Sequence, residues 1–191
     1  MRRALHLMGS LDDNDIEWLV ASGARHFKQR GIVLVQEGLP VDSLFVLLDG
    51  RLVVRLEAQG GKAIAWLRSG EIVGEISFVD SRPPTASVVV DEDSHVLAVP
   101  KTLLLERLRA DQGFAARFYR AIAVFLAERM RATVAQLGYG SNAGDRDSLS
   151  VDELDDSRME DVSHAAQRFD RLLKAVQQQA EPRSRAAGSQ Q

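Results

Sequence analysis

The stretch from Gly70 to Val88 carries the residues whose types and spacing best suit ligand-binding chemistry. It contains two Gly-Glu pairs four residues apart, followed by a short helix-like turn and a double proline. Gly74 lets the backbone come close to a ligand, and the N–H groups of Ile76 and Ser77 at the start of the turn could point into a pocket. Such a nest of N–H groups favours an anionic oxygen, typically of a phosphate. The stretch therefore predicts an anion-binding loop, although Gly-Glu pairs also end strands for purely structural reasons.

No other set of side chains in the sequence predicts catalysis or metal binding. The chain has no cysteine, which excludes disulfides, thiolate catalysis and cysteine zinc sites. His6, His26, His95 and His164 are scattered, with no pair at metal-ligand spacing, and neither a nucleophile-elbow motif nor a phosphate-loop lysine motif occurs. We therefore expect a protein that is not an enzyme and that holds no metal or cofactor.

The elements that must position the loop follow from the pattern of apolar residues. Between residues 32 and 99, short runs rich in Val, Ile and Leu recur at intervals of roughly ten residues, separated by glycine or polar turns. These runs are Ile32–Gln36, Leu44–Leu48, Leu52–Leu56, Ala63–Leu67, Ser87–Val90 and His95–Val99. Many short strands at regular spacing indicate a sandwich or barrel. The predicted fold is mainly β with flanking helices, a jelly-roll-like β-roll.

Helices are predicted on both sides of the strands. Apolar residues at helical spacing predict a short helix within Leu11–His26, another around residues 103–108, and a long one from about 114 to 137 that ends at Gly138. The long helix carries an apolar stripe made of Phe114, Phe118, Ile122, Phe125, Leu126, Met130, Val134 and Leu137. This stripe either packs on its own β-roll or pairs with the same helix of a second subunit, which makes a homodimer through residues 114–137.

The last fifty residues read as a tail rather than a second domain, because 191 residues allow one full-sized domain and an appendage. We expect the β-roll with its helices in residues 1–138, an acidic flexible linker in 139–161, and a short amphipathic helix with a disordered end in 162–191. The helix, at 163–178, has an apolar face made of Phe169, Leu172, Leu173 and Val176. A single short helix on a tether is marginal alone in water, so an unknown protein partner is expected to cover this face.

Charge and hydropathy narrow the function and the compartment. The net charge is −3, and basic residues are not clustered, so the sequence lacks the electrostatic footprint of a nucleic-acid-binding protein. One tail helix also cannot make a helix-turn-helix module. No signal-peptide core and no run of membrane-spanning length occurs, which predicts a cytoplasmic protein with no membrane span.

The stretch from Gly70 to Val88 resembles the phosphate-binding cassette of the cyclic-nucleotide-binding domain, found in the catabolite activator family, kinase regulatory subunits and nucleotide-gated channels. The resemblance covers roughly residues 7 to 138, because the glycines at 31, 38, 50, 60 or 61, 70 and 74 and the helices after Pro100 follow that family's spacing. The segment from Gly113 to Gly140 also resembles a bacterial subgroup described as bacteriocin-type-transport-associated. The resemblance implies a regulatory, signalling role with a cyclic nucleotide, cAMP or cGMP, as ligand.

Carried over position by position, the resemblance implies roles for single residues. Glu75 accepts a hydrogen bond from a ribose 2′-hydroxyl, and the N–H groups of Ile76 and Ser77 hold the cyclic phosphate. Thr133 corresponds to a threonine that contacts the purine from the long helix in some relatives. Thr85, in the segment that returns from the double proline, is a further candidate ligand-binding residue.

The sequence departs from the cassette at the position of the phosphate-binding arginine. The family's Pro-Arg-Ala-Ala-Thr-Val ending reads here as Pro-Pro-Thr-Ala-Ser-Val, so Pro84 stands where the arginine is expected. Proline offers neither charge nor a backbone donor, and losing one charge-assisted contact costs roughly 1.5–3 kcal/mol. Arg82 either reaches the site from the turn or is a solvated loop residue.

Two functions from different classes remain open at this point. The first is a non-enzymatic sensor or regulatory adaptor that binds a nucleotide and contacts a partner through its tail helix. The second is a ligand-blind dimerisation or protein-interaction module with a degenerate nucleotide pocket, which Pro84 supports.

Overall fold

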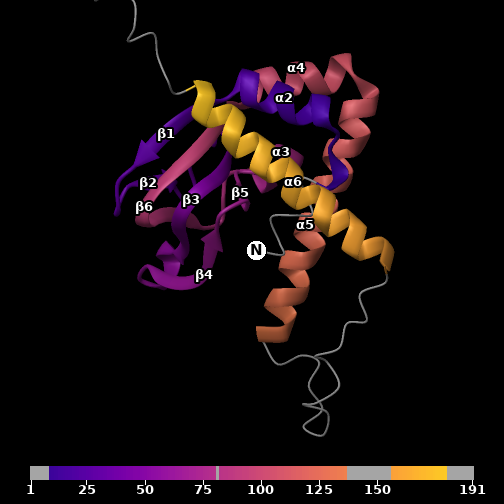
Figure 1. Ribbon diagram of the computed structural model, residues 1–191. Helices are drawn as coiled ribbons and strands as arrows, with labels where there is room; N and C mark the ends of the chain where they lie inside the picture. Colours follow the sequence, from indigo (N-terminus) through magenta and orange to yellow (C-terminus); the bar gives the residue numbers. More distant parts are fainter. Residues whose placement is uncertain (1–8, 81, 137–155, 180–191) are drawn as a thin grey trace, which may run out of the picture.

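The computed structural model describes residues 9–80, 82–136 and 156–179 of the chain (Figure 1). The elements, in chain order, are α2 (Asp13–Ser22), β1 (Ala24–Lys28), β2 (Val33–Val35), β3 (Ser43–Leu56), a 3₁₀ turn (Glu57–Gln59), β4 (Lys62–Arg68), β5 (Ile72–Val73), α3 (Ile76–Val79), β6 (Ser87–Pro100), α4 (Lys101–Ala110), α5 (Gln112–Gln136) and α6 (Asp156–Gln179). The strands form one side of the molecule, and α2, α4, α5 and α6 gather on the other (Figure 1).

The strands form one antiparallel sheet in the order β1-β6-β3-β4, with β2 paired to β6 and β5 paired to β3. The two longest strands, β3 and β6, bend where their register shifts between Leu47 and Leu52. Gly50 lies at this bend with φ +96°, and a Cβ there would lie 2.6 Å from the Asp93 carbonyl oxygen. Glycine is therefore needed at this point for the long strands to bend together. The architecture confirms the predicted β-roll with flanking helices.

Three details of the predicted elements differ from the structure. The runs 44–48 and 52–56 are one continuous strand, β3, and the runs 87–90 and 95–99 are one strand, β6, because bends at polar residues do not interrupt the pairing. The first helix, α2, lies within the predicted segment, but Ala24–Lys28 after it form a strand, β1, that was not predicted. The two-residue strand β5 was not predicted. Strand β1 is mostly exposed and polar, so only its pairing with the distant β6 identifies it.

The core has two parts. Inside the roll, aliphatic side chains from five strands form one cluster, made of Val35, Leu47, Leu52, Leu67, Val73, Val88, Val90 and Val96. Between the sheet and the helices lies a larger, aromatic cluster in which Phe114 and Phe118 of α5 are almost fully buried. Phe118 packs against Phe78 of α3, with ring centroids 5.9 Å apart, and Phe114 packs against Trp18 of α2 at 5.5 Å. Burying each phenylalanine contributes roughly 1.5–3 kcal/mol, so α5 is firmly held at its N-terminal half.

The apolar stripe of α5 is buried at its start and exposed farther along the helix. Its first members, up to Phe125, are buried in the chain's own core, which agrees with packing on the β-roll. Farther along, Met130 is 69% exposed and Val134 is 38% exposed. Leu137 and Gly138 lie outside the described residues. Homodimer formation through this helix stays a prediction.

The tail helix corrects the prediction of a free, tethered segment. Helix α6 contains the predicted helix 163–178 but begins at Asp156, inside the predicted linker 139–161, whose earlier residues lie outside the described part of the chain. It lies beside α2 (Figure 1), and Ala165, Leu172 and Val176 are each about 1% exposed or less within the aromatic core cluster. The apolar face that was expected to need a protein partner is therefore covered by the protein's own core.

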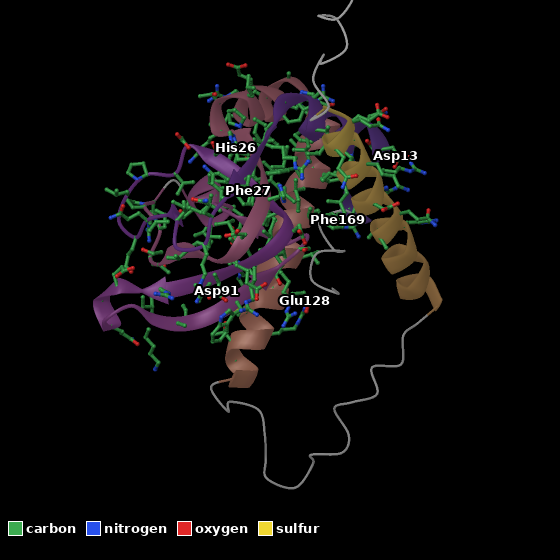
Figure 2. The ribbon with its side chains drawn as sticks, turned by 60° about the vertical axis from the view of Figure 1, so that its left-hand side comes forward. Asp13, His26, Phe27, Asp91, Glu128 and Phe169 are labelled. Atoms are coloured by element: carbon green, nitrogen blue, oxygen red, sulfur yellow. The ribbon has the colours of Figure 1, made fainter. Side chains whose placement is uncertain are left out.

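Ion pairs also connect α6 with α2. The Arg168 Nε lies 3.1 Å from an Asp13 carboxylate oxygen, Arg171 pairs with the other oxygen of the same group, and Arg168 also donates to the Gly9 carbonyl at 3.2 Å. Figure 2 shows Asp13 next to α6 and Phe169 on the side of α6 that faces the domain. The sequence could not reveal this docking, because Asp13 and the two arginines are more than 150 residues apart.

Of the helices that the structure describes, none combines the length and the apolarity needed to cross a membrane.

Candidate functional site

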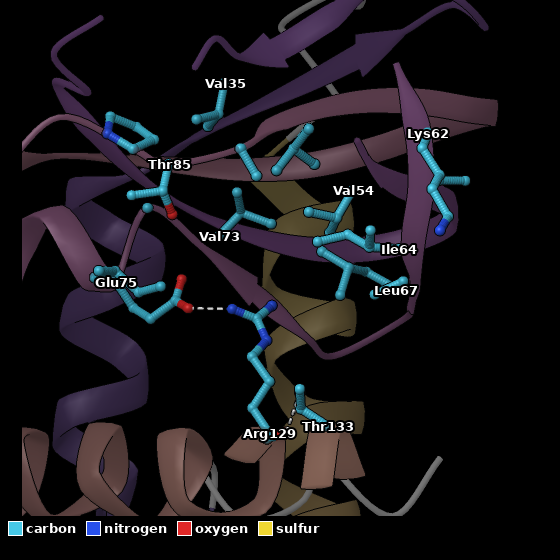
Figure 3. A pocket seen from close by; sticks show the side chains of 17 residues that line it. Val35, Val54, Lys62, Ile64, Leu67, Val73, Glu75, Thr85, Arg129 and Thr133 are labelled. Carbon is cyan, nitrogen blue, oxygen red and sulfur yellow. Dashed lines mark hydrogen bonds and ion pairs between the residues drawn. The ribbon is translucent and has the colours of Figure 1, made fainter. Parts of the chain in front are cut away.

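A pocket of about 590 Å³ lies between the mouth of the roll and the second half of α5 (Figure 3). Its size falls in the range of roughly 300–1,000 Å³ that small-molecule sites occupy. Most of its wall is apolar, with a few polar groups, and it is lined by Val35, Val54, Lys62, Ala63, Ile64, Ala65, Leu67, Val73, Gly74, Glu75, Ile76, Pro84, Thr85, Ala86, Val88, Arg129 and Thr133. The arrangement is suited to an apolar ring system that carries a small number of polar groups.

Five of the seven predicted ligand-binding residues line this pocket. They come from three separate segments of the chain and are Gly74, Glu75, Ile76, Thr85 and Thr133. The structure therefore brings the cassette, the segment after the double proline and the long helix together at one cavity. Whether these residues bind a ligand stays a prediction.

The other two predicted ligand-binding residues are Ser77 and Arg82. Ser77 lies in the first turn of α3, and its side chain is not among those that the structure describes. Arg82 does not line the pocket, because it lies in an exposed loop where its N–H donates to an Asp80 carboxylate oxygen at 3.0 Å. Of the two alternatives for Arg82, the geometry favours the solvated loop residue.

Gly74 is required by packing against the chain itself. Its φ is +93°, and a Cβ at this position would lie 2.8 Å from the Ser43 carbonyl oxygen and 3.2 Å from a methyl carbon of Val41. The close approach that demands glycine is thus to the backbone at the start of β3. From the sequence, Gly74 was expected to let the backbone approach a ligand, whereas the structure gives this glycine a reason that involves no ligand. Its place in a ligand site stays a prediction.

Glu75 is the most deeply buried charged residue that lines the pocket, with 2% of its surface exposed. Its carboxylate forms an ion pair with Arg129, which rises from α5 into the cavity (Figure 3). Burial raises the pKa of the Glu75 carboxyl, and the positive charge of Arg129 opposes this rise only in part. The buried carboxylate and the guanidinium thus hold the cassette and α5 together across the pocket.

Sequence reasoning missed Arg129 and Lys62, the two cationic residues that line the pocket. Arg129 is the one that pairs with Glu75. Its guanidinium carbon lies 4.9 Å from the centroid of the Phe125 ring, four residues earlier, and its carbonyl accepts a hydrogen bond from the Thr133 hydroxyl at 3.0 Å. A signal existed in the sequence, because an arginine four residues before Thr133 shares a helix face with it. The sequence alone could not show that this face turns toward Glu75.

Pro84 lines the pocket at the position expected for the cassette arginine. Its carbonyl accepts a hydrogen bond from the Gly38 N–H at 2.9 Å, which ties this segment to the turn between β2 and β3. The cationic side chains that do line the cavity are Lys62 and Arg129.

A second ion pair fixes the helix that carries Arg129. Arg117 of α5 donates two hydrogen bonds, at 2.6 and 2.8 Å, to the fully buried carboxylate of Asp15 in α2, and its Nη2 lies 3.1 Å from Asp12. Asp12 and Asp15 also exchange side-chain bonds with each other's N–H groups, which caps α2. Burial by itself would raise the pKa of Asp15, but these bonds outweigh burial and hold it below its ordinary value.

Within the ranges that the structure describes, no three histidine, aspartate or glutamate side chains gather closely enough to hold a metal ion.

Comparisons with known proteins agree with the fold described above. The family model described as the cyclic nucleotide-binding domain matches residues 25–111. No curated protein sequence matches the chain. Among solved structures, a cyclic nucleotide-binding domain from Methylobacillus flagellatus is 20% identical, with a TM-score of 0.64 over 73% of this chain and 83% of that one.

Two further solved structures are similar. The N-terminal domain of a transcriptional regulator from Streptomyces coelicolor is 29% identical, with a TM-score of 0.56 over 69% of this chain and 93% of that one. The c-di-GMP-responsive global regulator CLP of Xanthomonas campestris is 20% identical, with a TM-score of 0.59 over 66% and 63% of the two chains. These comparisons confirm the family resemblance and the fold, while the bacteriocin-transport subgroup stays a prediction.

Proposed function

Because residues 25–111 match the cyclic nucleotide-binding domain family and the chain folds as that family does, we propose that the protein is a non-enzymatic sensor that binds a cyclic nucleotide, cAMP or cGMP. The observation that carries the proposal is the open cavity at the cassette, which is large enough for such a ligand. A pocket that had lost its ligand would be under no constraint to stay open, and filling it with side chains would add buried apolar contacts.

Each part of the ligand is assigned to residues around the cavity. Glu75 accepts a hydrogen bond from the ribose 2′-hydroxyl, the N–H groups of Ile76 and Ser77 face the phosphate, and Thr133 reaches the purine from α5. The apolar wall formed by the strands, with Thr85 at its edge, packs against the base. Each contact is supported by the lining of the pocket or, for Ser77, by its place in α3.

The ligand-blind module is the alternative, and Pro84 is the observation that favours it. Without the cassette arginine, the affinity for a phosphate ligand falls by about one to two decades if nothing replaces that contact. The two functions make opposite predictions for the same titration.

We also propose that the protein forms a homodimer through the second half of α5. Met130 and Val134 are exposed there and continue the stripe whose first half is buried. They are next to Arg129 and Thr133 in sequence, so the proposed dimer contact and the pocket use the same segment of α5. The apolar face of α6 is already buried, so any protein partner would use its exposed face or another surface.

Calorimetric and thermal-shift titrations test the sensor proposal. The panel is cAMP, cGMP and a cyclic dinucleotide, each up to millimolar concentration, with ATP as a control for unspecific phosphate binding. Ligand at one hundred times its dissociation constant adds about 2.7 kcal/mol to the free energy of unfolding, which raises Tm by about 5–10 °C in a protein of this size. No heat and no shift with any cyclic nucleotide would refute the sensor and leave the ligand-blind module.

A further inference from the structure

The Arg129 guanidinium has N–H donors inside the pocket besides the one that binds Glu75. An arginine carries five N–H donors, and the contacts of this side chain among the described residues are the ion pair from Nη1 to Glu75 and the stacking on Phe125. Its side chain is 28% exposed, and Figure 3 shows the guanidinium inside the cavity. The remaining N–H groups are therefore accessible to a bound ligand.

Glu75 fixes where these donors lie. It is 2% exposed and immediately precedes Ile76, the first residue of α3. A guanidinium held by this carboxylate lies next to the cassette turn, although it comes from a helix 54 residues away in sequence. Stacking on Phe125 holds the guanidinium from a second side and limits its rotation.

The net charge of the pocket lining favours an anionic ligand. Lys62 and Arg129 are positive and Glu75 is negative, so the lining sums to one positive charge. Pro84, in the place of the expected arginine, adds none, and Arg82 lies outside the lining. An anionic ligand would neutralise this excess charge in a largely apolar cavity, where charge pairs are stronger than in water.

We propose that Arg129 supplies the positive charge that binds the anionic group of the ligand, in place of the arginine that the cassette lacks, and that Glu75 is the positioning residue that holds it there. The ligand class is an organic anion with an apolar ring body, such as a cyclic nucleotide. This inference rests on the proposed function for its ligand class and on the pocket geometry for its residue. The guanidinium binds Glu75 on one edge and the ligand on another.

The first test compares a charged and an uncharged ligand on matched variants. The wild type is expected to bind cAMP about 10–100-fold more tightly than the uncharged nucleoside adenosine, as one charge-assisted contact provides. In Arg129→Gln this preference should fall to about threefold or less. The control Arg131→Gln removes an arginine of the same helix that pairs with Glu128 and lies outside the pocket lining, and it should keep the preference.

Two further variants separate positioning from charge. Glu75→Gln keeps an acceptor for Arg129 and should retain most of the preference for the anion, whereas Glu75→Ala removes the acceptor and should lose it. A merely structural role for Glu75 would change the affinity for both ligands equally. Preference that survives in Arg129→Gln but disappears in Lys62→Gln would overturn the proposal.

The second test needs no nucleotide. The side-chain Nε–Hε signal of Arg129, identified by its absence in the Arg129→Gln spectrum, is followed by NMR while inorganic phosphate is added, and it should move to saturation. If cyclic nucleotides do not bind and phosphate still moves this signal, the proposed function fails and the role of Arg129 stands. If cAMP binds and the preference for the charged ligand is undiminished in Arg129→Gln, the proposed function stands and the role of Arg129 is refuted. If neither cAMP nor phosphate binds, both are refuted.

Discussion

Replacing Leu172 by alanine tests whether α6 is an integral part of the folded domain. Leu172 is fully buried and belongs to the aromatic core cluster together with Phe114 and Phe118 of α5. Buried Leu→Ala changes cost about 2–5 kcal/mol, because apolar contacts are lost and a cavity remains. Since α6 lies at the surface of the domain and can settle into part of the space, we expect about 2–4 kcal/mol here.

Urea denaturation followed by circular dichroism measures this loss. With a slope of about 2 kcal/mol per M, the midpoint of Leu172→Ala should fall by about 1–2 M. The control Gln178→Ala changes an exposed residue of the same helix and should stay within about 0.5 kcal/mol of the wild type. Amide hydrogen exchange should also rise in α2, whose Asp13 holds α6 by ion pairs.

Equal midpoints for Leu172→Ala and Gln178→Ala would refute the docking of α6 on its own domain. The apolar face of the helix would then be free for another protein, as the sequence by itself suggests.

Three further changes test the site and its supports. Pro84→Arg should tighten cAMP binding about tenfold or more, measured by calorimetry, because it returns a guanidinium to the lining of the pocket; unchanged affinity would mean that the anion lies elsewhere. Gly74→Ala should lower the free energy of unfolding by about 2–3 kcal/mol, measured by denaturation, because the residue has a positive φ and its Cβ would meet the Ser43 carbonyl; a neutral effect would contradict the packing argument. Arg117→Gln should lower the free energy of unfolding by about 2–3 kcal/mol at pH 7, less than breaking a fully buried pair, because Arg117 is about one third exposed. Since the folded-state pKa of Asp15 lies below its ordinary value of 3.8, this cost should be full above pH 4 and shrink as the pH falls through the lowered pKa; a difference that does not change down to pH 2 would show that Asp15 does not titrate with the pair.

Much of the fold follows from local sequence patterns. Recurring runs rich in Val, Ile and Leu located β4 and most of β3 and β6, and the stripe beginning at Phe114 located α5. Polar stretches hid the continuity of the long strands, because their pairing bends through Gly50 without breaking. Strand β1 was not predicted for a similar reason, since its partner strand lies about seventy residues away.

Some residues of the candidate site could likewise be identified from the sequence, and others could not. The resemblance to the family identifies the cassette from Gly74 to Ser77 and the proline at 84 in place of an arginine, because both depend on residues close together in the chain. Arg129 cannot be read in this way. Its role depends on which face of α5 turns toward Glu75, and packing of the phenylalanines earlier in the helix fixes that rotation.

The sequence by itself thus determined the β-roll through the spacing of its apolar runs. Its resemblance to the cyclic nucleotide-binding domain located the cassette and the proline that stands in place of the arginine. The tertiary structure alone decided that α6 packs on α2 and that the positive charge beside the cassette comes from α5. Both contacts join residues far apart in the chain. Burial of apolar faces and pairing of buried charges determine such contacts, because local sequence patterns do not distinguish among the possible arrangements.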